Sequence, residues 1–378
     1  MIIKELHLNG TSLGSKVKIN NVSFDRLNVL VGVSGAGKTT IISGLSSLIS
    51  LAEGGKSRTI EWTLHFEDDL KRNVFWKGQL SQAIEYDAEG KAFSKFVNES
   101  LTIDGTPIFS RDEKSVIFSE KELPRLDDDK SLLFLLRQST ELKDVFKSLT
   151  SAVLISVDSE LFSNNMTVPL IDGKIHKEVL ARNGNLSIKK LSAQFKELTC
   201  REKIYYAFKY DKDAFDELEF IYTNIFPEVK KITPRLIKTH TESSDGRRVI
   251  FIELDLKNGQ KINQSQISSG MFKAMMLLSE LQFGNNNSPI IIDEIENSLG
   301  VNCLPDILSE LQQTSNQVII TSHHPRVIND IPKSFWKVVS RGKNGDITTY
   351  PASEVLDFDS NHDNFLLLMN SNIYRGYE

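Results

Sequence analysis

The chain has 378 residues, of which 40% are hydrophobic and 25% charged, and its formal net charge is −5. This composition is typical of a globular protein with a large core, and the acidic total argues against a surface coated for nucleic acid. No apolar run approaches the roughly 18 to 20 residues that span a bilayer, and the first ten residues carry Glu5 where a secretory leader would be apolar. We therefore expect a cytoplasmic protein without a membrane segment.

Cysteine use and the distribution of charge limit the ligands further. Cys200 and Cys303 are far apart and belong to no Cys-pair motif, so we expect reduced thiols and no zinc. Residues 174–248 contain 16 Lys and Arg against 11 Asp and Glu. Solvated helix faces explain such a run most simply, and a local basic surface for nucleic acid is the alternative.

The first sixty residues predict strands, a glycine-rich loop and a helix. Apolar and polar residues alternate between Ile3 and Val22, which is typical of short antiparallel strands. The apolar run LNVLVGV, which starts at Leu27, predicts a buried strand that leads into a loop. After the loop, TIISGLSSLISLA places apolar residues at the spacing of a helix.

The middle of the chain changes from strands to helices. Residues 59–119 are typical of strands, with a turn at Asp104-Gly105. From Lys121 to about Ile232 the apolar residues recur at helical spacing, which predicts a largely helical insertion. The apolar stripes are short and interrupted at Asn164-Asn165, Gly173 and Gly184. No heptad repeat persists, so long coiled-coil arms are not expected.

The last third predicts strands around one long helix. VIFIELDLKNGQKI indicates two strands joined at an Asn-Gly turn, and a helix follows from about Ser269 to Phe283. The β-branched runs PIIIDE and QVIITS are typical of central parallel strands, and KVVSRGKNGDITTYP predicts a hairpin at Asn344-Gly345. The sequence thus predicts an α/β protein in three segments: 1–120 with the glycine-rich loop and an antiparallel β subdomain, 121–235 as the helical insertion, and 236–378 as a second α/β segment.

The glycine-rich loop fits a phosphate-binding pattern, G-x-x-x-x-G-K-[ST], between a predicted strand and a predicted helix. Glycines allow successive amide N–H groups to face one point, and the helix adds the partial positive charge of its N-terminus. We expect Lys38 to reach the outer phosphates of a nucleotide and the Thr39 hydroxyl to ligate magnesium. The residues expected to contact nucleotide are Gly32, Ser34, Gly35, Ala36, Gly37, Lys38, Thr39 and Thr40.

Three further candidate sites follow in the last third. Asp293 ends the strand PIIIDE, where a carboxylate can hold magnesium, and Glu294 beside it can deprotonate the water that attacks a γ-phosphate. His323 ends the strand QVIITS and can hydrogen-bond a γ-phosphate, although a His pair in a polar loop is the plainer interpretation. The start of the long helix is either a simple N-cap or a second anion-receiving terminus. It is formed by Ser268, Ser269 and Gly270.

In this order the four sites resemble those of ABC-type ATPases, and more narrowly the SMC/RecF-like group that includes AAA15-type and OLD-related ATPases. The matching motifs are Gly32–Thr39 for Walker A, ISSGM for the signature L-S-G-G-Q, Asp293-Glu294 for Walker B with its catalytic Glu, Asn297–Gly300 for the D-loop and His323 for the switch His. The resemblance covers about 1–60 and 250–345. It departs from the family pattern at Val33, Ser34, Ser269, Met271 and Gly300, and Gln79, Gln82 and Gln138 are the candidates for the Q-loop.

The resemblance implies a P-loop NTPase fold with a mixed sheet, ATP and Mg²⁺ as ligands, and a homodimer or higher homo-oligomer. In such a dimer Lys38, Thr39 and Asp293 of one copy hold ATP with magnesium. Ser268 and Gly270 of the other copy close over the γ-phosphate. Hydrolysis through Glu294 then opens the clamp, so chemistry and conformational change are one event.

Three functions are compatible with this group. A transporter motor subunit is disfavoured because 232 residues separate Lys38 from Gly270, far more than in such motors. A RecF-like DNA-repair ATPase is the second. We favour the third, an ATPase similar to the subunits of bacterial antiphage systems such as Septu and retron modules, which regulates a separately encoded nuclease or toxin. The insertion and residues 354–378 are then expected docking surfaces, and no nuclease motif follows the last hairpin.

Overall fold

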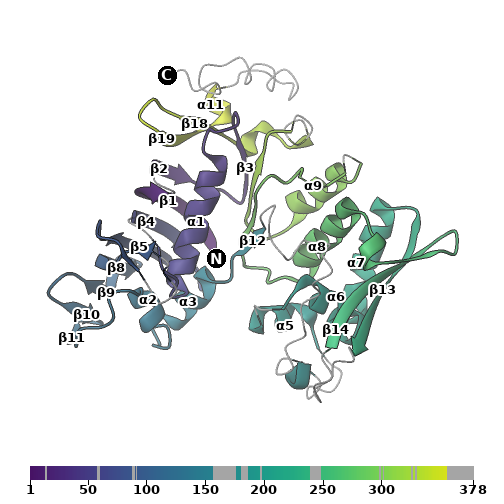
Figure 1. The fold of residues 1–378 in the computed structure, drawn as a ribbon, viewed down its shortest axis with the longest axis horizontal. Coiled ribbons are helices and arrows are strands. Elements are labelled where there is room, and N and C mark those ends of the chain that lie inside the picture. The colour runs from purple at the N-terminus through teal and green to yellow at the C-terminus, as the bar shows by residue number, and fades with distance from the viewer. Residues whose placement is uncertain are drawn as a thin grey trace. The chain divides into compact units, whose positions relative to one another are not determined.

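The fold is taken from a computed structural model of the chain. It describes residues 1–12, 15–57, 60–86, 90, 92–155, 176–179, 186–195, 198–238, 248–297, 299–300, 302–324, 327 and 330–355. The chain forms two compact units, drawn in Figure 1. Unit 1 comprises Met1–Leu154, Asn287–Glu294 and Asn316–Glu378, and unit 2 comprises Ile155–Asn286 and Ile295–Ser315.

Unit 1 is built on a mixed sheet of 14 strands. Their order across the sheet is β11 (Lys121–Leu123), β10 (Val116–Phe118), β9 (Thr106–Arg111), β8 (Phe96–Ile103), β5 (Asn73–Leu80), β4 (Ile60–Glu67), β1 (Ile2–Ser12), β2 (Ser15–Ser23), β19 (Asp346–Pro351), β18 (Trp336–Arg341), β3 (Leu27–Val31), β17 (Val318–Ser322), β16 (Ile290–Ile292) and β12 (Val153–Ile155). A separate two-stranded ribbon joins β6 (Glu85–Tyr86) to β7 (Ala92–Phe93).

The part of this sheet that matters for function is parallel. β3 pairs in parallel with β17 on one side and β18 on the other, and β17 also pairs in parallel with β16. Every residue of β3, β16 and β17 is buried, as expected for β-branched runs that are covered on both faces. Because parallel strands end at the same edge of a sheet, the loops after β3, β16 and β17 lie together.

The rest of the sheet is largely antiparallel and packs against helices. In β4 and β5, buried side chains alternate with half-buried or exposed ones, so one face of each strand carries apolar residues into the core. Helix α1 (Lys38–Ala52) runs along this face in Figure 1, and α2 (Leu132–Leu135) and α3 (Lys143–Leu149) contact it. Trp62, Trp76 and Leu45 belong to the resulting core.

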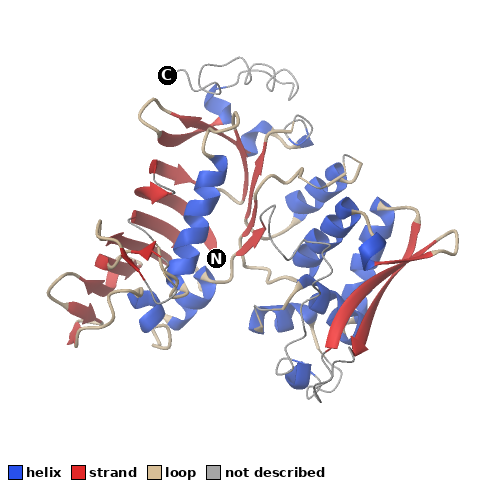
Figure 2. Ribbon diagram, in the orientation of Figure 1, coloured by secondary structure: helices blue, strands red, loops and turns tan. Residues whose placement is uncertain are grey.

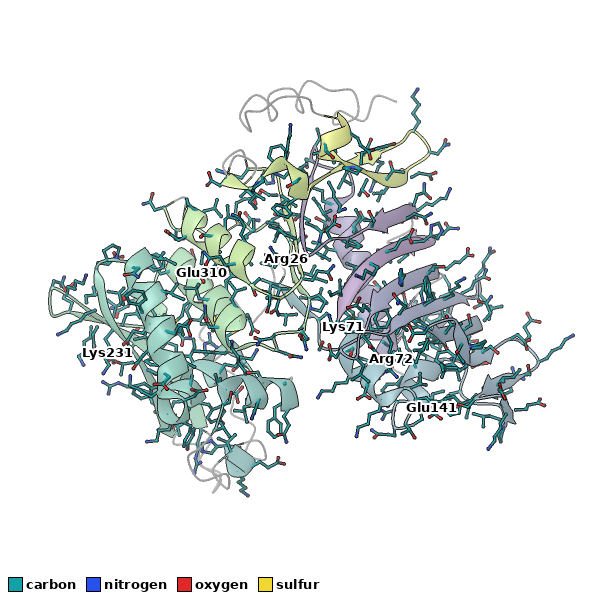
Figure 3. All side chains as sticks on the ribbon, turned by 180° about the vertical axis from the view of Figure 1, so that it is seen from behind. Arg26, Lys71, Arg72, Glu141, Lys231 and Glu310 are labelled. Carbon is teal, nitrogen blue, oxygen red and sulfur yellow. The ribbon has the colours of Figure 1, made fainter. Side chains whose placement is uncertain are left out.

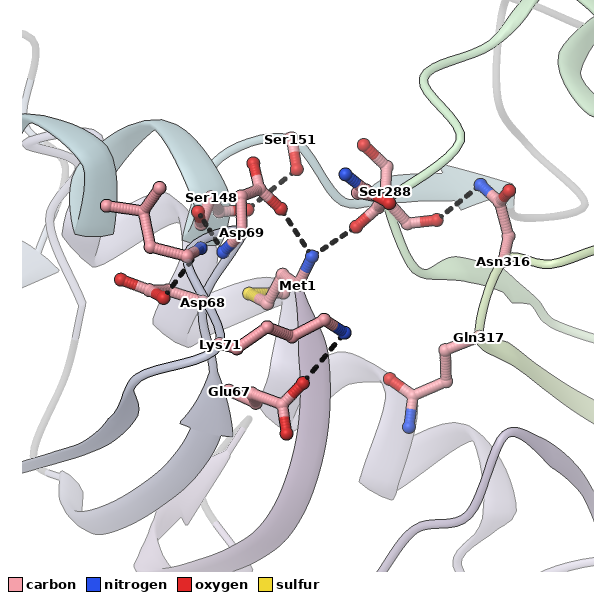
Figure 4. Close-up of polar contacts among 12 residues, drawn as sticks. Met1, Glu67, Asp68, Asp69, Lys71, Ser148, Ser151, Ser288, Asn316 and Gln317 are labelled. Atoms are coloured by element: carbon pink, nitrogen blue, oxygen red, sulfur yellow. Dashed lines mark hydrogen bonds and ion pairs between the residues drawn. The ribbon is translucent and has the colours of Figure 1, made fainter. Parts of the chain in front are cut away.

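Polar contacts fix the edges of unit 1, as Figure 4 shows. The amino group of Met1 donates to Asp69 Oδ1 at 2.6 Å and to the carbonyl of Asn287, and Asn316 Nδ2 donates to the carbonyl of Ser288 at 2.7 Å. Arg26, labelled in Figure 3, precedes β3, and its carbonyl accepts from the Val318 N–H at 2.7 Å. These bonds connect the start of β1 to the segment before β16, and the residue before β3 to the start of β17.

Unit 2 packs helices against one face of a small antiparallel sheet, as Figure 2 shows. The sheet has the order β13 (Val229–Lys238), β14 (Arg248–Leu256), β15 (Lys261–Asn263). The helices are α5 (Ile188–Gln194), α6 (Cys200–Tyr210), α7 (Lys212–Ile225), α8 (Ser269–Phe283) and α9 (Leu304–Gln313), with a 3₁₀ turn η2 (Gln264–Gln266). Helix α8 is the centre of this unit, because it contacts α5, α6, α7 and α9.

Short elements complete the described chain: a 3₁₀ turn η3 (Lys333–Phe335) and helix α11 (Ala352–Val355), both in unit 1. None of the helices in the described ranges has both the length and the apolar character needed to cross a membrane. The longest, α1 and α8, have 15 residues each, so this part of the chain holds no long coiled coil.

The predicted α/β class with a mixed sheet is confirmed, and β3, α1, α8, β16, β17 and the final hairpin form as expected. Residues 121–232, predicted as a largely helical insertion, contain α2, α3, α5, α6 and α7, but β11, β12 and the start of β13 were not expected there. A register shift between Val229 and Lys231 breaks the alternation in β13, so its strand character comes from pairing with β14 rather than from local pattern.

The segment boundaries predicted from the sequence stay a prediction. Residues 121–154 belong to unit 1 by their contacts, where α2 and α3 pack on α1. Several positions of the sequence analysis lie outside the described residues, namely Asn164-Asn165, Gly173, Gly184, Ser298 in the D-loop and the tail 356–378.

Candidate nucleotide site

The loop between β3 and α1 has the backbone that a phosphate-binding loop requires. Gly35 and Gly37 have φ angles of +85° and +110°, in the left-handed region that favours glycine. Gly37 is also the N-cap of α1, and that helix begins without a side-chain cap bond. The amide groups of the first turn and the partial positive charge of the helix therefore face this loop, which suits an anion.

The loop is pressed against the neighbouring strands. A Cβ at Gly32 would lie 2.6 Å from the Val339 carbonyl oxygen on β18, and one at Gly37 would lie 2.5 Å from Ile347 Cδ1 on β19. Neither position accepts a side chain without a shift of its surroundings. Close packing therefore favours glycine at position 32, and both close packing and the φ angle favour it at position 37.

Lys38 is almost buried, at 8% exposure, and its ammonium group folds back on the loop. Nζ donates to the carbonyl of Gly32 at 2.7 Å and to that of Val33 at 3.1 Å. A cation held by two loop carbonyls sits where phosphate oxygens would offer a stronger partner. The residues present therefore fit a nucleotide phosphate chain at this loop.

Asp293 and Glu294 follow β16 at the same edge of the sheet. Asp293 is 8% exposed, and its Oδ1 lies 3.3 Å from the Thr39 hydroxyl and 2.5 Å from the Thr321 hydroxyl. Glu294 has a φ angle of +47°, and its backbone N–H donates to Thr321 Oγ1 at 2.7 Å. A glutamate in the left-handed region is strained, and such strain is typical of functional positions.

His323 completes this edge in unit 1. It directly follows β17, the strand that lies between β3 and β16, and its side chain is exposed. The structure therefore brings together Lys38, Thr39, Asp293, Glu294 and His323 at one edge of the parallel strands. Of the other predicted loop residues, Ala36 is buried, Thr40 is half-buried and Ser34 is exposed.

Magnesium would find few protein ligands here. In the part of the chain that the structure describes, no group of three or more His, Cys, Asp or Glu side chains is placed to hold a metal ion. The Thr39 hydroxyl and the Asp293 carboxylate are oxygen ligands of the type that Mg²⁺ prefers. They fit an ion whose remaining ligands are phosphate oxygens and water, as in P-loop NTPases.

The predicted signature residues form the start of α8 in unit 2. Ser268 is the N-cap, its hydroxyl accepts from the Met271 N–H at 3.3 Å, and both Ser268 and Ser269 are exposed. Lys273, one turn further on, donates to the carbonyl of Asn297 at the start of the predicted D-loop. The plain N-cap is therefore present, and it lies at an accessible helix N-terminus.

The Q-loop stays unassigned. Gln79 lies on β5 and accepts from Asn98 Nδ2 at 3.1 Å on the neighbouring strand β8, so it is part of the antiparallel sheet surface. Gln82 and Gln138 lie in a bend and a turn of the same unit. None of the three has a contact with the loop residues 32–40 among the described hydrogen bonds.

Sequence reasoning missed Thr321. Its side chain is fully buried, and it contacts both acidic residues that follow β16. The available signal was a polar residue near the end of the otherwise apolar run QVIITS. A threonine is common in strands for its β-branched shape, so the residue type alone did not separate a packing role from a polar one.

A pocket of about 350 Å³ lies elsewhere in unit 2. It is lined by the ends of α8 and α9, including Leu281, Gln282 and Glu310, the last labelled in Figure 3. Burial, and then the nearby acids Glu217 and Asp306, raise the pKa of Glu310. Because Ser268 caps the opposite end of α8, this pocket does not include the signature residues.

Comparison with known proteins places these features in a family. A family model described as "AAA domain, putative AbiEii toxin, Type IV TA system" matches residues 27–329. No curated protein matches the sequence. The matched range contains the phosphate loop, the start of α8, Asp293-Glu294 and His323.

Solved structures of Smc heads match nearly the whole chain. The Smc head domain with an extended coiled coil, bound to the C-terminal domain of ScpA and derived from Pyrococcus furiosus, is 12% identical, covers 94% of this chain and 97% of its own, and has a TM-score of 0.52. The SmcHead bound to the C-winged helix domain of ScpA is 16% identical, with coverages of 93% and 97% and a TM-score of 0.48. The SMC head domain from Thermotoga maritima is 14% identical, with coverages of 93% and 99% and a TM-score of 0.42. The Pyrococcus furiosus match shows that the fold is that of an Smc head.

Proposed function

The chain belongs to the AAA-domain family described as putative AbiEii toxin of Type IV TA systems, and on that premise we propose that it is an ATPase that dimerises around ATP. One observation carries the proposal. The Asp293 carboxylate lies 3.3 Å from the hydroxyl of Thr39, the last residue of the phosphate-loop pattern. Glu294, whose backbone is strained, is the next residue after Asp293. This is the arrangement that magnesium-assisted phosphoryl transfer to water needs.

Each residue at this edge has a role in the proposed reaction. Lys38 would exchange its two loop carbonyls for phosphate oxygens, and Thr39 and Asp293 would hold Mg²⁺. Glu294 accepts a proton from the attacking water, and His323 hydrogen-bonds the γ-phosphate. Mg²⁺ supplies the positive charge that offsets charge on the phosphate oxygens.

The second half of the site is proposed to come from another copy of the chain. Ser268 and Ser269, both exposed, and the half-buried Gly270 form a helix N-terminus in unit 2. In a dimer this terminus donates to the γ-phosphate held by the partner's phosphate loop, so bound ATP joins the two copies. Hydrolysis removes that link and releases the dimer.

We further propose that the dimer regulates a separately encoded effector, a nuclease or toxin, in bacterial antiphage defence. The family description supports a separately encoded second component, because it names one member of a toxin–antitoxin system. Cells that carry the chain with its neighbouring gene should lose protection from phage when Glu294 is changed to Gln. Unchanged plating efficiency of phage on the Gln variant would count against regulation through ATP.

The alternative is a RecF- or SMC-like ATPase that acts on DNA. Its support is the excess of Lys and Arg in residues 174–248. In the described part of that range, however, Lys203 is paired with Glu280 at 2.7 Å and Arg235 with Glu253 at 2.9 Å. These two carboxylates offset part of the positive charge that this alternative relies on.

Phosphate release tests the ATPase directly. The wild-type chain should release phosphate from ATP in a Mg²⁺-dependent reaction, and Glu294→Gln should lower the rate by about 100-fold or more, because it removes the base and keeps the shape. Equal, near-zero rates for both chains would instead indicate a scaffold that is gated by nucleotide binding alone.

A further inference from the structure

Thr321 is a buried threonine at the end of β17 that contacts both acidic residues of the candidate site. Its side chain has no exposed surface, and it is the fourth residue of the five in β17. The strand lies between β3, which leads into the phosphate loop, and β16, which leads into Asp293. Thr321 is thus placed at the centre of the edge where the proposed chemistry occurs.

The hydroxyl group of Thr321 makes two hydrogen bonds of opposite sense. It donates to Asp293 Oδ1 at 2.5 Å, because an ionised carboxylate only accepts. It accepts from the backbone N–H of Glu294 at 2.7 Å, because that group only donates. One hydroxyl therefore fixes the carboxylate of one residue and the peptide group of the next.

The first bond bears on magnesium. Asp293 Oδ1 lies between two hydroxyls, that of Thr321 at 2.5 Å and that of Thr39 at 3.3 Å. Thr39 belongs to α1 and Thr321 to β17, so the carboxylate is set from both sides. Removing a partner that orients a ligating carboxylate typically lowers metal affinity or activity by about 10- to 100-fold.

The second bond bears on the base. Glu294 adopts a φ angle of +47°, a conformation that costs a non-glycine residue roughly 1 to 2 kcal/mol. The bond from its N–H to Thr321 is a native contact that holds this conformation. The direction in which the chain leaves β16, and with it the start of the Glu294 side chain, is fixed by β17.

We propose that Thr321 is a positioning residue that sets Asp293 for magnesium and Glu294 for water activation. The proposal rests on the ATPase function proposed above. It predicts that Thr321 acts on the Mg²⁺ dependence and on kcat. The affinity for ATP without metal should not depend on Thr321, because Lys38 and the loop amides provide that binding.

Two matched variants test the proposal. Thr321→Val keeps the β-branched shape and removes the hydroxyl, whereas Thr321→Ser keeps the hydroxyl and removes a methyl group. For each, phosphate release is measured over a range of Mg²⁺ concentrations, and the Kd of a fluorescent ATP analogue is measured with Mg²⁺ and with EDTA. Thermal unfolding shows whether each variant is folded.

The Val variant should lower kcat and raise the Mg²⁺ concentration for half-maximal rate, each by about 10-fold or more, with the Kd in EDTA unchanged. The Ser variant should stay within about threefold of wild type. A folded Val variant with wild-type Mg²⁺ dependence of both rate and binding would overturn the proposal, and so would equal loss in Ser and Val. If the wild type binds ATP without hydrolysing it, the ATPase proposal fails, and the ratio of the two Kd values still decides the role of Thr321.

Discussion

Glu294 is a residue at which backbone stability and chemistry are in conflict. Its φ angle of +47° suits Gly or Asn better than Glu, because a longer side chain gains no local hydrogen bond in the left-handed region. We expect Glu294→Asn to raise the free energy of unfolding by up to about 1 kcal/mol while lowering ATP turnover by about 100-fold or more. Urea unfolding and phosphate release measure the two effects.

Glu294→Gln is the matched control for this prediction. It keeps the length and strain of the side chain, so its unfolding free energy should equal that of wild type while its turnover falls as well. A Glu294→Asn chain that is less stable than the Gln chain would show that the strain inferred from the φ angle does not exist in solution.

Some residues of the candidate site could be predicted from the sequence, and one could not. Lys38, Asp293 and His323 were predicted because each stands at a fixed place relative to an apolar strand or a glycine pattern. The structure places all three at one edge of the parallel strands. Thr321 was missed because its role depends on a contact with Asp293, 28 residues away in sequence. No local sequence pattern shows that the strands of these two residues are neighbours.

At the scale of elements, a buried carboxylate joins four parts of the antiparallel sheet region. Glu99 on β8 pairs with Arg111 on β9 at 2.8 Å, and it also accepts from Trp76 Nε1, the Ser131 hydroxyl and the Leu132 N–H at the start of α2. Removing one partner of a buried ion pair leaves the other as an uncompensated buried charge, which lowers the unfolding free energy by about 3 to 5 kcal/mol. Glu99→Ala should therefore lower the unfolding free energy by that amount in urea unfolding.

Glu122 on β11 provides the control for the buried carboxylate. It is an exposed glutamate in the same sheet, and Glu122→Ala should change the unfolding free energy by no more than about 0.5 kcal/mol. Equal effects of the two substitutions would mean that the Glu99 contacts contribute no net stability.

The two thiols of unit 2 are expected to be unreactive in the folded protein. Burial, and then the neighbouring Glu280, raise the pKa of Cys200 well above its ordinary value, and burial raises the pKa of Cys303. Because the thiolate is the reactive form, a thiol reagent at pH 8 should modify neither residue until the chain is unfolded in urea. Rapid modification of the folded chain would show that α6 or α9 opens at its N-terminus.

Elements with a strong local pattern were predictable, and those stabilised by distant pairing were not. The buried runs of β3, β16 and β17 and the apolar helix α8 follow from residue type and period alone. β13 could not be predicted in this way, because adjacent lysines and a register shift interrupt its apolar–polar alternation. Its strand conformation is stabilised by pairing with β14. The same reason explains β12, whose three residues add to the edge of a sheet built from the other end of the chain.

In the whole molecule, the residues of the two proposed half-sites belong to different units. Lys38, Asp293 and Glu294 belong to unit 1, and Ser268 and Gly270 belong to unit 2. Each set lies within a single unit. The proposed ATPase needs one set from each of two copies, so its complete site exists only in an assembly that ATP holds together.

Sedimentation velocity of the Glu294→Gln chain, with and without ATP and Mg²⁺, tests this claim most directly. We expect a monomer without nucleotide, a species of twice the mass with ATP and Mg²⁺, and no such species when Ser268→Arg is added to block the second half-site. A mass that ignores nucleotide, or an ATP-dependent dimer that persists with Ser268→Arg, would contradict it.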